Sequence, residues 1–475
     1  MTQKLIKPDV CVIGAGSGGL SVAAGAAQMG LSVVLFEKAE MGGDCLNFGC
    51  VPSKALISAG KAAQAARTSA RFGIANHEPL IHWAGVKTHV QGVIATIAPV
   101  DSQERFEKLG CTVIREHAKF TDPNTVESPS ARVRARRIVI ATGSRAVVPR
   151  IPGLDQTPYL TNETIFSIQD QPRHLIILGA GPIGIELGQA FRRLGSQVTI
   201  LEAGRALAKA EPEAASVAIQ ALRAEGVTIL ENTKATAVSG QAGAISVATD
   251  TGQAVAGTHL LVAVGRSPVL EGLDLEAGRV SHDAKGVHTK PTLRSVSNPR
   301  VWAVGDANGR SFFTHAAGWH ASVWVRNALF KTGTKVDSLP VPAVTYCEPE
   351  LAQVGLTAAQ AEQLLGTPNV RVVRWSFEEN DRAQAEASHE GFAQIVTDAK
   401  GTILGACIVG DNAGDIIQQI TLAMSNKLKI RALTNVIAPY PTRGEIVKRV
   451  AGQWYVPTLF SPRTKFLVAL LQKIP

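Results

Sequence analysis

A glycine-rich turn that occurs twice constrains this 475-residue chain more than any other feature. In the first copy, the apolar run 10–13 enters the turn, a small-residue stretch at 20–30 has helical character, and a second apolar run ends at Glu37. The glycines of this turn are Gly14, Gly16, Gly18 and Gly19. A strand, a glycine turn, a helix and a second strand ending in an acid predict a βαβ unit that binds a dinucleotide.

The second copy has the same order of elements. The apolar run 175–178 enters the turn, a helical stretch follows at 185–195, and the next apolar run ends at Glu202. Its glycines are Gly179, Gly181 and Gly184. Two complete units predict two dinucleotide sites, whereas a single glycine-rich turn could serve packing alone.

Each glycine has a physical reason in such a turn. The first permits the tight turn, the second lets the backbone approach a pyrophosphate, and the third lets the helix pack closely on the strand. The N-terminus of the helix attracts the phosphate charge through its free N–H groups and its dipole. The acid at the end of the second strand can bind the hydroxyl groups of a ribose.

The two sites are expected to bind different nucleotides. The first lies next to a cysteine pair in the sequence and suits a flavin dinucleotide. In the second, the carboxylate of Glu202 favours a free 2′-hydroxyl and repels a 2′-phosphate, which predicts NADH over NADPH. Arg205 offers an alternative partner for a 2′-phosphate, although a solvated loop position accounts for it better.

Cys45 and Cys50 flank Gly49 and carry the predicted chemistry. Pro52 and the apolar residues after it predict a helix that begins close to Cys50. A helix N-terminus lowers the pKa of a thiol because it stabilises the thiolate, and Lys54 adds positive charge one turn further on. We therefore expect a reactive dithiol or disulfide beside a flavin.

Two other interpretations of this pair are a structural disulfide and half of a metal site. Residues 1–8 lack the apolar core of a signal peptide, and no run of 18 apolar residues occurs, so a cytoplasmic protein is expected. Structural disulfides are uncommon in that compartment. No metal site is predicted, because the remaining cysteines form no pair at metal spacing and fit ordinary buried thiols: Cys11, Cys111, Cys347 and Cys407.

Composition adds limits to this prediction. Hydrophobic residues make up 45% and charged residues 18% of the chain, so it can bury large cores. The formal net charge of +9 fits two phosphate-bearing cofactors, and no nucleic-acid partner is expected. After the prolines near residue 340, strand-like runs at 370–377, 392–398 and 403–410 and a helical pattern at 414–427 predict a separate α+β domain.

The segment 42–56 closely resembles the redox motif of the class I flavin disulfide reductases, which include dihydrolipoamide dehydrogenase, glutathione reductase and mercuric reductase. The resemblance extends to about residue 455 and includes the segments 141–143, 179–186, 261–266, 303–306 and 344–350. It implies an α/β fold with two Rossmann-like dinucleotide-binding domains and a C-terminal α+β dimerisation domain in a homodimer. The expected ranges are 1–150 and 275–338 for FAD, 151–274 for NAD(H), 339–460 for dimerisation, and 461–475 for a basic, apolar tail.

The resemblance also assigns roles to residues. Cys50 exchanges electrons with the flavin, Cys45 attacks a disulfide substrate, and Lys54 pairs with Glu186 near the flavin N5. Asp306, at the end of an apolar strand, is assigned to sugar or ribityl hydroxyls, with a helix cap as the other interpretation. The full set assigned to FAD and NAD is Gly14, Gly16, Gly18, Gly19, Glu37, Lys38, Gly43, Asp44, Lys54, Ala118, Thr142, Gly143, Gly179, Gly181, Gly184, Glu202, Gly265, Asp306 and His315.

One position departs from the family pattern. Disulfide-reducing members carry a His-Pro-Thr segment whose His, paired with a Glu, moves the proton of the interchange thiol; here Tyr440 stands at the His position and Glu445 at the Glu position. The reference pKa of Tyr is about 10 and that of His about 6.5, so an unperturbed Tyr is a poor acceptor for a thiol proton. A Tyr at this position resembles mercuric reductase. That enzyme also carries a C-terminal cysteine pair, yet no cysteine follows Cys407 here. Packing in the dimer interface is another interpretation of Tyr440.

These observations predict a FAD- and NADH-dependent oxidoreductase that acts on a small disulfide or dithiol, or on a lipoyl-bearing protein. A metal-ion reductase of the mercuric type is the first alternative, and a redox-sensing or binding flavoprotein is the second.

Residues 463–473 form a basic, apolar helix candidate that could make weak contact with an anionic membrane or pack on the dimer.

Overall fold

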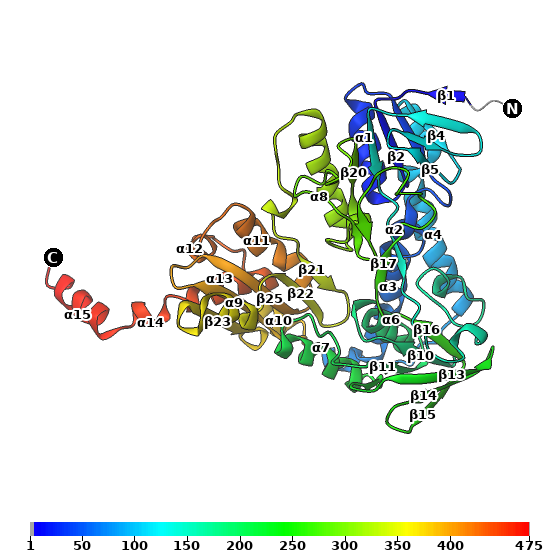
Figure 1. Cartoon of the computed structure of the whole chain (residues 1–475). Helices are drawn as coiled ribbons and strands as arrows, with labels where there is room; N and C mark the ends of the chain where they lie inside the picture. The colour runs from blue at the N-terminus through cyan, green and yellow to red at the C-terminus, as the bar shows by residue number, and fades with distance from the viewer. Residues whose placement is uncertain (1–3, 475) are drawn as a thin grey trace. The chain divides into compact units, whose positions relative to one another are not determined.

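The computed structural model describes residues 4–474, so residues 1–3 of the first expected domain and Pro475 of the expected tail lie outside the described residues (Figure 1). The chain divides into two compact units. The first comprises the described residues up to Ala59 with Leu80–Gly179 and Ala235–Ser338, and the second comprises Gly60–Pro79, Ala180–Lys234 and the residues from Leu339 onward. Between residues 4 and 474, no helix is long and apolar enough to cross a bilayer.

A parallel five-stranded sheet organises the first unit. Its order is β20 (Val301–Ala303), β8 (Arg137–Ile140), β2 (Val10–Ile13), β3 (Val33–Phe36) and β4 (Cys111–Ile114). The strands are short apolar runs, and β2, β3 and β20 are buried at every position. Continuous burial of this kind is typical of a parallel sheet that is covered on both faces.

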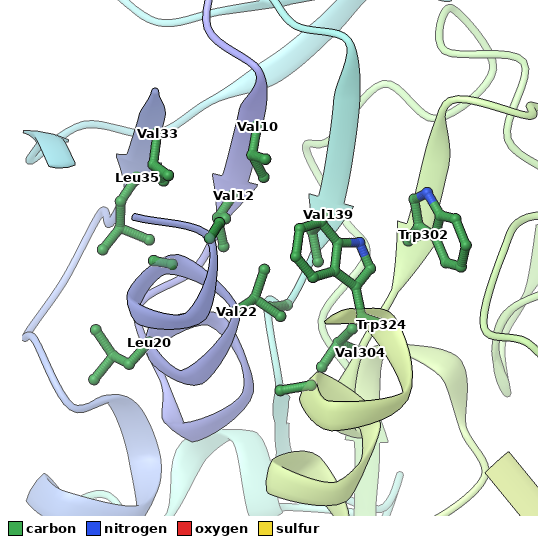
Figure 2. Close-up of a cluster of buried hydrophobic side chains, with 14 of the residues drawn as sticks. Val10, Val12, Leu20, Val22, Val33, Leu35, Val139, Trp302, Val304 and Trp324 are labelled. Atoms are coloured by element: carbon green, nitrogen blue, oxygen red, sulfur yellow. The ribbon is translucent and has the colours of Figure 1, made fainter. Parts of the chain in front are cut away.

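Helices α1 (Ser17–Gln28) and α8 (Thr314–Trp324) pack against one another, and α1 also contacts β2 and β3. Figure 2 shows Val22 of α1 beside Trp324 of α8, while Leu20 projects from the other side of α1; all three belong to one buried cluster with the valines of the strands. Trp324 is among the largest fully buried side chains. This apolar cluster fixes the helix that follows the first glycine turn against the sheet.

Both helices that follow a glycine turn begin earlier than the sequence pattern predicts. α1 begins at Ser17 rather than Leu20, and α6 (Pro182–Arg193) begins at Pro182 rather than Ile185. The third glycine therefore lies inside the first turn of its helix. In α1 only a glycine fits at this third position, because a Cβ at Gly19 would lie 1.9 Å from the carbonyl oxygen of Gly14.

Smaller elements complete the first unit. The helices are α2 (Gly43–Asn47), the first part of α3 (Cys50–Arg67), α4 (Trp83–Asp101) and α5 (Gln103–Lys108). A four-stranded sheet has the order β1 (Lys4–Ile6), β7 (Ala131–Arg134), β6 (Thr125–Glu127) and β5 (Lys119–Asp122). Three further pairs of strands are β9 (Ser144–Ala146) with β17 (Arg266–Pro268), β10 (His174–Leu178) with β16 (His259–Val262), and β18 (His282–Asp283) with β19 (Gly286–Val287). An antiparallel meander consists of β13 (Ala235–Gln241), β14 (Ala244–Thr249) and β15 (Ala254–Gly257).

The second unit contains α6, the parallel pair β11 (Gln197–Leu201) and β12 (Thr228–Leu230), α7 (Pro212–Ala224) and an antiparallel sheet. The order of that sheet is β21 (Ala343–Thr345), β22 (Glu350–Gly355), β25 (Ile403–Gly410), β24 (Phe392–Asp398) and β23 (Val370–Ser376). Its helices are α9 (Ala358–Leu365), α10 (Asp381–Ala385), α11 (Ala413–Ser425), α12 (Ile430–Thr434), α13 (Ile446–Gln453), α14 (Val456–Leu459) and α15 (Pro462–Leu471). The three strands and the helix predicted after residue 369 are all present.

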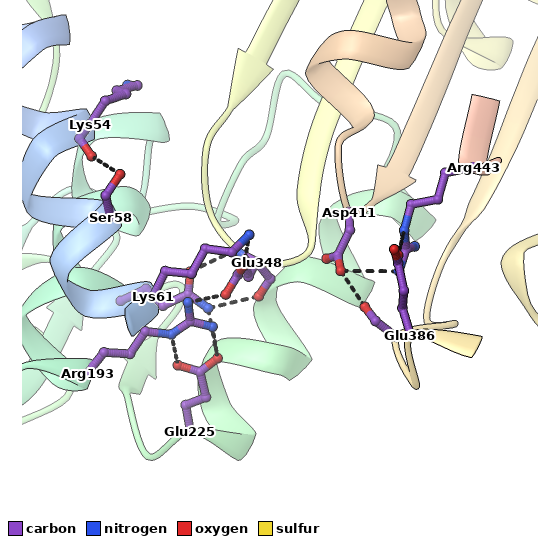
Figure 3. A network of polar contacts seen from close by, with 11 residues as sticks. Lys54, Ser58, Lys61, Arg193, Glu225, Glu348, Glu386, Asp411 and Arg443 are labelled. Carbon is purple, nitrogen blue, oxygen red and sulfur yellow. Dashed lines mark hydrogen bonds and ion pairs between the residues drawn. The ribbon is translucent and has the colours of Figure 1, made fainter. Parts of the chain in front are cut away.

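A buried arginine ties α6 to the segment before β22 (Figure 3). Arg193 is only 5% exposed and donates two hydrogen bonds to the carboxylate of Glu225, with a further ion pair to Glu348. Burial alone would raise the pKa of Glu348, but the charges of Arg193 and Lys61 outweigh it and lower that pKa. Removing one partner would leave a buried charge unpaired, which is strongly destabilising. The cluster therefore holds α6 firmly to the segment before β22.

Candidate active site

The first glycine of each turn is required by the protein's own backbone. Gly14 has a φ of +104° and Gly179 a φ of +103°, in the region that favours glycine. A Cβ would lie 2.4 Å from the carbonyl oxygen of Ala141 at the first turn and 2.5 Å from that of Ala263 at the second. These two glycines allow the turns to form whether or not a ligand binds.

The protein's own backbone does not require a glycine at the second position of either turn. Gly16 has φ −82° and ψ −176°, and Gly181 has φ −76° and ψ −179°, which any residue can adopt. A Cβ at Gly16 would have Gly43 Cα as its nearest neighbour at 3.9 Å, and a Cβ at Gly181 would have no described atom within 4 Å. The missing side chains leave the helix N-terminus open to a ligand, which fits a pyrophosphate group.

The two helix N-termini share a further property. Gly16 and Gly181 are the N-cap residues of α1 and α6, and neither helix has a capping hydrogen bond from a side chain. The first N–H groups of a helix have no partner within it, so an external phosphate can accept from them. The described residues therefore fit two dinucleotides.

The acid after each turn is held by backbone amides. Glu37 accepts hydrogen bonds from the N–H groups of Ala15 at 2.7 Å and Ala39 at 2.8 Å. Glu202 accepts from Ala180 at 2.8 Å and Gly204 at 2.9 Å. Each carboxylate is thus fixed beside its own glycine turn, and an ionised carboxylate keeps further acceptor sites for ribose hydroxyls.

The redox segment is joined directly to the first glycine turn. The N–H of Gly42 donates to the carbonyl of Ala15 at 3.0 Å, and Gly16 and Gly42 form an isolated parallel bridge. Gly43 has a φ of +60°, and a Cβ there would lie 2.7 Å from Gly16 Cα. Because the two backbones are this close, Cys45 in α2 is carried next to the first nucleotide site.

Cys45 and Cys50 are both free thiols in this structure, and each is the hydrogen-bond partner of the other. Cys50 is the first residue of α3, and its Sγ lies 3.4 Å from Oγ1 of Thr314, the first residue of α8. Two helix N-termini therefore meet at this sulfur. The positive dipole ends of α3 and α8 both stabilise a thiolate at this position.

The hydrogen bond from Cys45 lowers the pKa of Cys50 to about 6. Burial opposes this shift, and the Thr314 hydroxyl and the charge of Lys54 support it. The pKa of Cys45 is raised, first by its hydrogen bond to Cys50 and then by burial. At neutral pH the pair therefore holds one proton, on Cys45, and one thiolate, on Cys50.

The other cysteines have a different environment. All four are buried, and burial raises their pKa values: Cys11, Cys111, Cys347 and Cys407. A buried neutral thiol is inert as a nucleophile. The described residues contain no group of three or more His, Cys, Asp and Glu side chains that could hold a metal ion.

A chain of polar contacts links Asp306 to the redox segment. Ser144 donates to Asp306, and Arg266 donates to Oγ of Ser144 at 2.8 Å. Arg266 also forms an ion pair with Asp44 at 3.1 Å, and Asn162 donates to Asp44 at 2.8 Å. Burial raises the pKa of Asp306, so its carboxyl group depends on these partners. Asp44 and Asp306, both expected at the flavin site, thus belong to one network.

The remaining expected residues have varied surroundings. Thr142 donates to the carbonyl of Val269 at 2.6 Å, His315 stacks on Phe313, and Ala118 is buried in the core. Lys54 lies in the part of α3 that belongs to the first unit, while Glu186 lies in α6 of the second. Their pairing therefore stays a prediction.

Tyr440 and Glu445 each have another partner. The Tyr440 hydroxyl donates to Asp381 at 2.8 Å, and this hydrogen bond and the charge of Asp381 raise the pKa of the phenol. The Tyr440 side chain is 68% exposed. Glu445 forms an ion pair with Arg449 at 2.7 Å. With its pKa raised, Tyr440 has even less phenolate available at neutral pH to accept a thiol proton than a free tyrosine has.

Several residues of the site were not predicted from the sequence. Arg266 ends the segment 261–266 that resembles the family, and Thr314 directly precedes His315, so both lay next to recognised signals. Ser144 likewise directly follows Gly143. Asn162 and Asp381 carried no signal, because their contacts join segments far apart in the chain. His320 is similar: its Nδ1 accepts from the N–H of Gly305, beside Asp306, and burial lowers its pKa to about 4.

The chain belongs to the pyridine nucleotide-disulphide oxidoreductases: the model of that family matches residues 8–321, and its dimerisation domain matches residues 341–451. This confirms the predicted fold class of two Rossmann-type nucleotide-binding domains followed by a dimerisation domain. The protein is a flavoprotein oxidoreductase, and the family implies FAD and NAD(P)H as its cofactors. The dimerisation domain supports a homodimer.

Named relatives fall into more than one activity. A mercuric reductase of Streptomyces lividans is 34% identical over 454 residues, with 93% of this chain and 95% of the relative covered. Dihydrolipoyl dehydrogenase 3 of Pseudomonas aeruginosa is 34% identical over 462 residues, with 93% and 97% covered. The structure of the HOCl-induced flavoprotein disulfide reductase RclA from Escherichia coli matches with a TM-score of 0.83 at 25% identity, covering 94% of this chain and 99% of that one.

The contrast between the first and second glycines gives a matched pair of variants. Gly14→Ala should lower the stability of the cofactor-free protein by about 2–4 kcal/mol, because a Cβ there meets a carbonyl oxygen at positive φ. Gly16→Ala should leave that stability within about 1 kcal/mol but weaken FAD binding at least about tenfold. Thermal melting of the cofactor-free protein and FAD titration measure both effects. Normal FAD affinity in Gly16→Ala would contradict the assignment of the site.

The contact of Cys50 with Thr314 predicts a shift in thiolate formation. In the reduced protein, alkylation of Cys50 by iodoacetamide should increase as pH rises through about 6, where its thiolate forms. Thr314→Val should move this midpoint upward by about one pKa unit, so labelling slows near neutral pH and recovers in alkaline solution. Thr314→Ser retains the hydroxyl and serves as the control. An unchanged midpoint in Thr314→Val would show that the hydroxyl does not stabilise the thiolate.

Proposed function

We propose that this protein uses NADH to reduce a small disulfide through the Cys45–Cys50 pair. The observation that carries the proposal is the stabilised Cys50 thiolate, hydrogen-bonded to Cys45 and placed beside the first nucleotide turn. A thiolate is the reactive form in thiol–disulfide exchange. The family membership supports a redox role for this pair.

The steps follow from the two thiols. Bound FAD would supply the link by which two electrons pass from NADH to the pair. The Cys50 thiolate first takes the proton of Cys45. Cys45, now a thiolate, attacks one sulfur of the substrate, forms a mixed disulfide and releases one substrate thiolate, which takes that proton back from Cys50. Cys50 then attacks Sγ of Cys45, releases the second thiolate and closes the Cys45–Cys50 disulfide. The second thiolate takes a proton from solvent, and the substrate has gained two electrons and two protons.

The second site supports NADH as the electron donor. Glu202 is held beside the turn by Ala180 and Gly204, and its charge repels a 2′-phosphate. Arg205 is exposed. We therefore propose a preference for NADH over NADPH.

The surroundings of Tyr440 favour reduction of a disulfide over oxidation of a dithiol. Oxidation of a dithiol requires a base that removes a thiol proton, and Asp381 holds the phenol of Tyr440 in its protonated form. Reduction of a disulfide needs no outside base, because the Cys50 thiolate of the pair can take the proton of Cys45. By the family motif, Tyr440 and Glu445 are proposed to face the reacting groups of the partner subunit.

A second candidate is reduction of a metal ion. Tyr440 in place of His is the observation in its favour, and relatives named mercuric reductase match this chain at 34% and 31% identity. Against it, no cysteine follows Cys407 to deliver a soft metal ion. A lipoyl-bearing protein is the alternative source of the disulfide.

The domain ranges and the compartment belong to the same proposal. We assign 1–150 and 275–338 to FAD, 151–274 to NAD(H), 339–460 to dimerisation, and 461–475 to a tail. The compact units divide the chain at other points. A cytoplasmic location fits a redox-active pair.

A substrate panel tests the proposed function. NADH-dependent turnover should be observed with lipoamide or glutathione disulfide and should exceed turnover with NADPH and with Hg(II). Oxidation of dihydrolipoamide should be slow in the wild type and rise at least about tenfold in Tyr440→His, because an imidazole can accept the thiol proton. Tyr440→Phe is the control, since it retains the ring and removes the hydroxyl.

Two outcomes would contradict this account. Turnover with Hg(II) that exceeds every disulfide and is lost in Tyr440→Phe would establish the metal-ion reductase instead. Dihydrolipoamide oxidation that is fast in the wild type and unchanged in Tyr440→His would show that the proton argument is wrong.

A further inference from the structure

The last two helices expose an apolar surface that the proposed function does not use. We call residues 456–474, with α14 and α15, the C-terminal segment. None of the ten residues of α15 is buried. Its exposed apolar residues include Phe466 at 73%, Leu467 at 52% and Leu470 at 51% exposure. Single exposed apolar residues are ordinary on a protein surface, but a contiguous set indicates an interaction site.

The helix is well formed without this burial. Ser461 is the N-cap of α15 and accepts a hydrogen bond from the N–H of Thr464 at 3.3 Å. The Thr464 hydroxyl donates to the carbonyl of Thr458 at 2.8 Å, which ties α15 to α14. A short helix that buries nothing is marginal in water, so an apolar partner would stabilise it.

The apolar residues are continuous and surround the helix. The run Phe466–Leu471 is longer than one turn, so apolar side chains point to all sides of the axis. A helix of this kind is normally surrounded by apolar material. Its ten residues span only about 15 Å, about half the hydrocarbon thickness of a bilayer. The helix can therefore enter a membrane surface but cannot cross it.

The charges of the segment identify its partner. It carries Arg463, Lys465 and Lys473, and the sequence contains no Asp or Glu after Glu445. A two-fold contact between the segments of two copies would bring these cations together with no carboxylate between them. The dimerisation match ends at residue 451, before the segment begins. An anionic lipid surface offers both the negative charge and the apolar interior.

We propose that the C-terminal segment binds the surface of an anionic bilayer. Phe466–Leu471 enters the boundary between headgroups and acyl chains, while Arg463, Lys465 and Lys473 flank this run and reach the phosphates with their long side chains. This contact is independent of the redox site, which uses none of these residues.

Sedimentation with vesicles tests this proposal on the full-length, FAD-loaded dimer. Vesicles of phosphatidylcholine with about 30 mol% phosphatidylglycerol should bind the protein at least about tenfold more tightly than vesicles of phosphatidylcholine alone. High salt should weaken this binding, because it screens the charges. The combined Arg463→Gln, Lys465→Gln and Lys473→Gln variant, and Phe466→Asp with Leu470→Asp, should each lose at least about tenfold in affinity.

Leu364→Asp is the matched control, since Leu364 is 68% exposed on α9, outside the segment, and its substitution should leave binding unchanged. Disulfide-dependent NADH oxidation by every variant shows that the redox site has remained intact. Equal binding to both vesicle types, or full binding after deletion of residues 461–475, would overturn the proposal. Dissociation of the dimer by that deletion, measured by analytical ultracentrifugation, would also overturn it and assign the helix to a second copy.

Discussion

The close backbone contact between the first glycine turn and the redox segment is the constraint on which the site depends. Gly42 donates to the carbonyl of Ala15, and Gly43 leaves no room for a Cβ against Gly16. The turn whose open helix end fits a pyrophosphate is therefore continuous with the segment that carries Cys45. A side chain at Gly43 would separate the two, and the dithiol would move away from the nucleotide site.

The stabilisation of the Cys50 thiolate depends on the placement of two helices. Cys50 begins α3, and Thr314 begins α8, so two positive helix ends meet at one sulfur. The apolar contact between α1 and α8 holds the second helix in position, which links the buried cluster around Trp324 to the chemistry of the thiolate. A change in that core would be expected to alter the pKa of Cys50 without touching the redox pair.

Periodic and local features were predictable from the sequence, and long-range polar contacts were not. The two glycine turns, Glu37 and Glu202 share one local pattern, so their strands and helices were predicted closely. Both helix starts were predicted three residues too late, because glycine has a low helix propensity, yet the third glycine of each turn lies inside the first turn of its helix. The network from Asp306 to Asp44 and the bond from Tyr440 to Asp381 join distant segments, and no spacing rule predicts them.

Anaerobic titration with NADH tests the central claim most directly, namely that a stabilised Cys50 thiolate lies against the flavin. The two-electron-reduced wild type should develop the long-wavelength absorbance of charge transfer from a thiolate to oxidised flavin. Cys45→Ser cannot form the disulfide, so it should show that band before NADH is added and lose it when NADH reduces the flavin, and Cys50→Ser should lack the band throughout. Absence of the band in the wild type, or its survival in Cys50→Ser, would contradict the account.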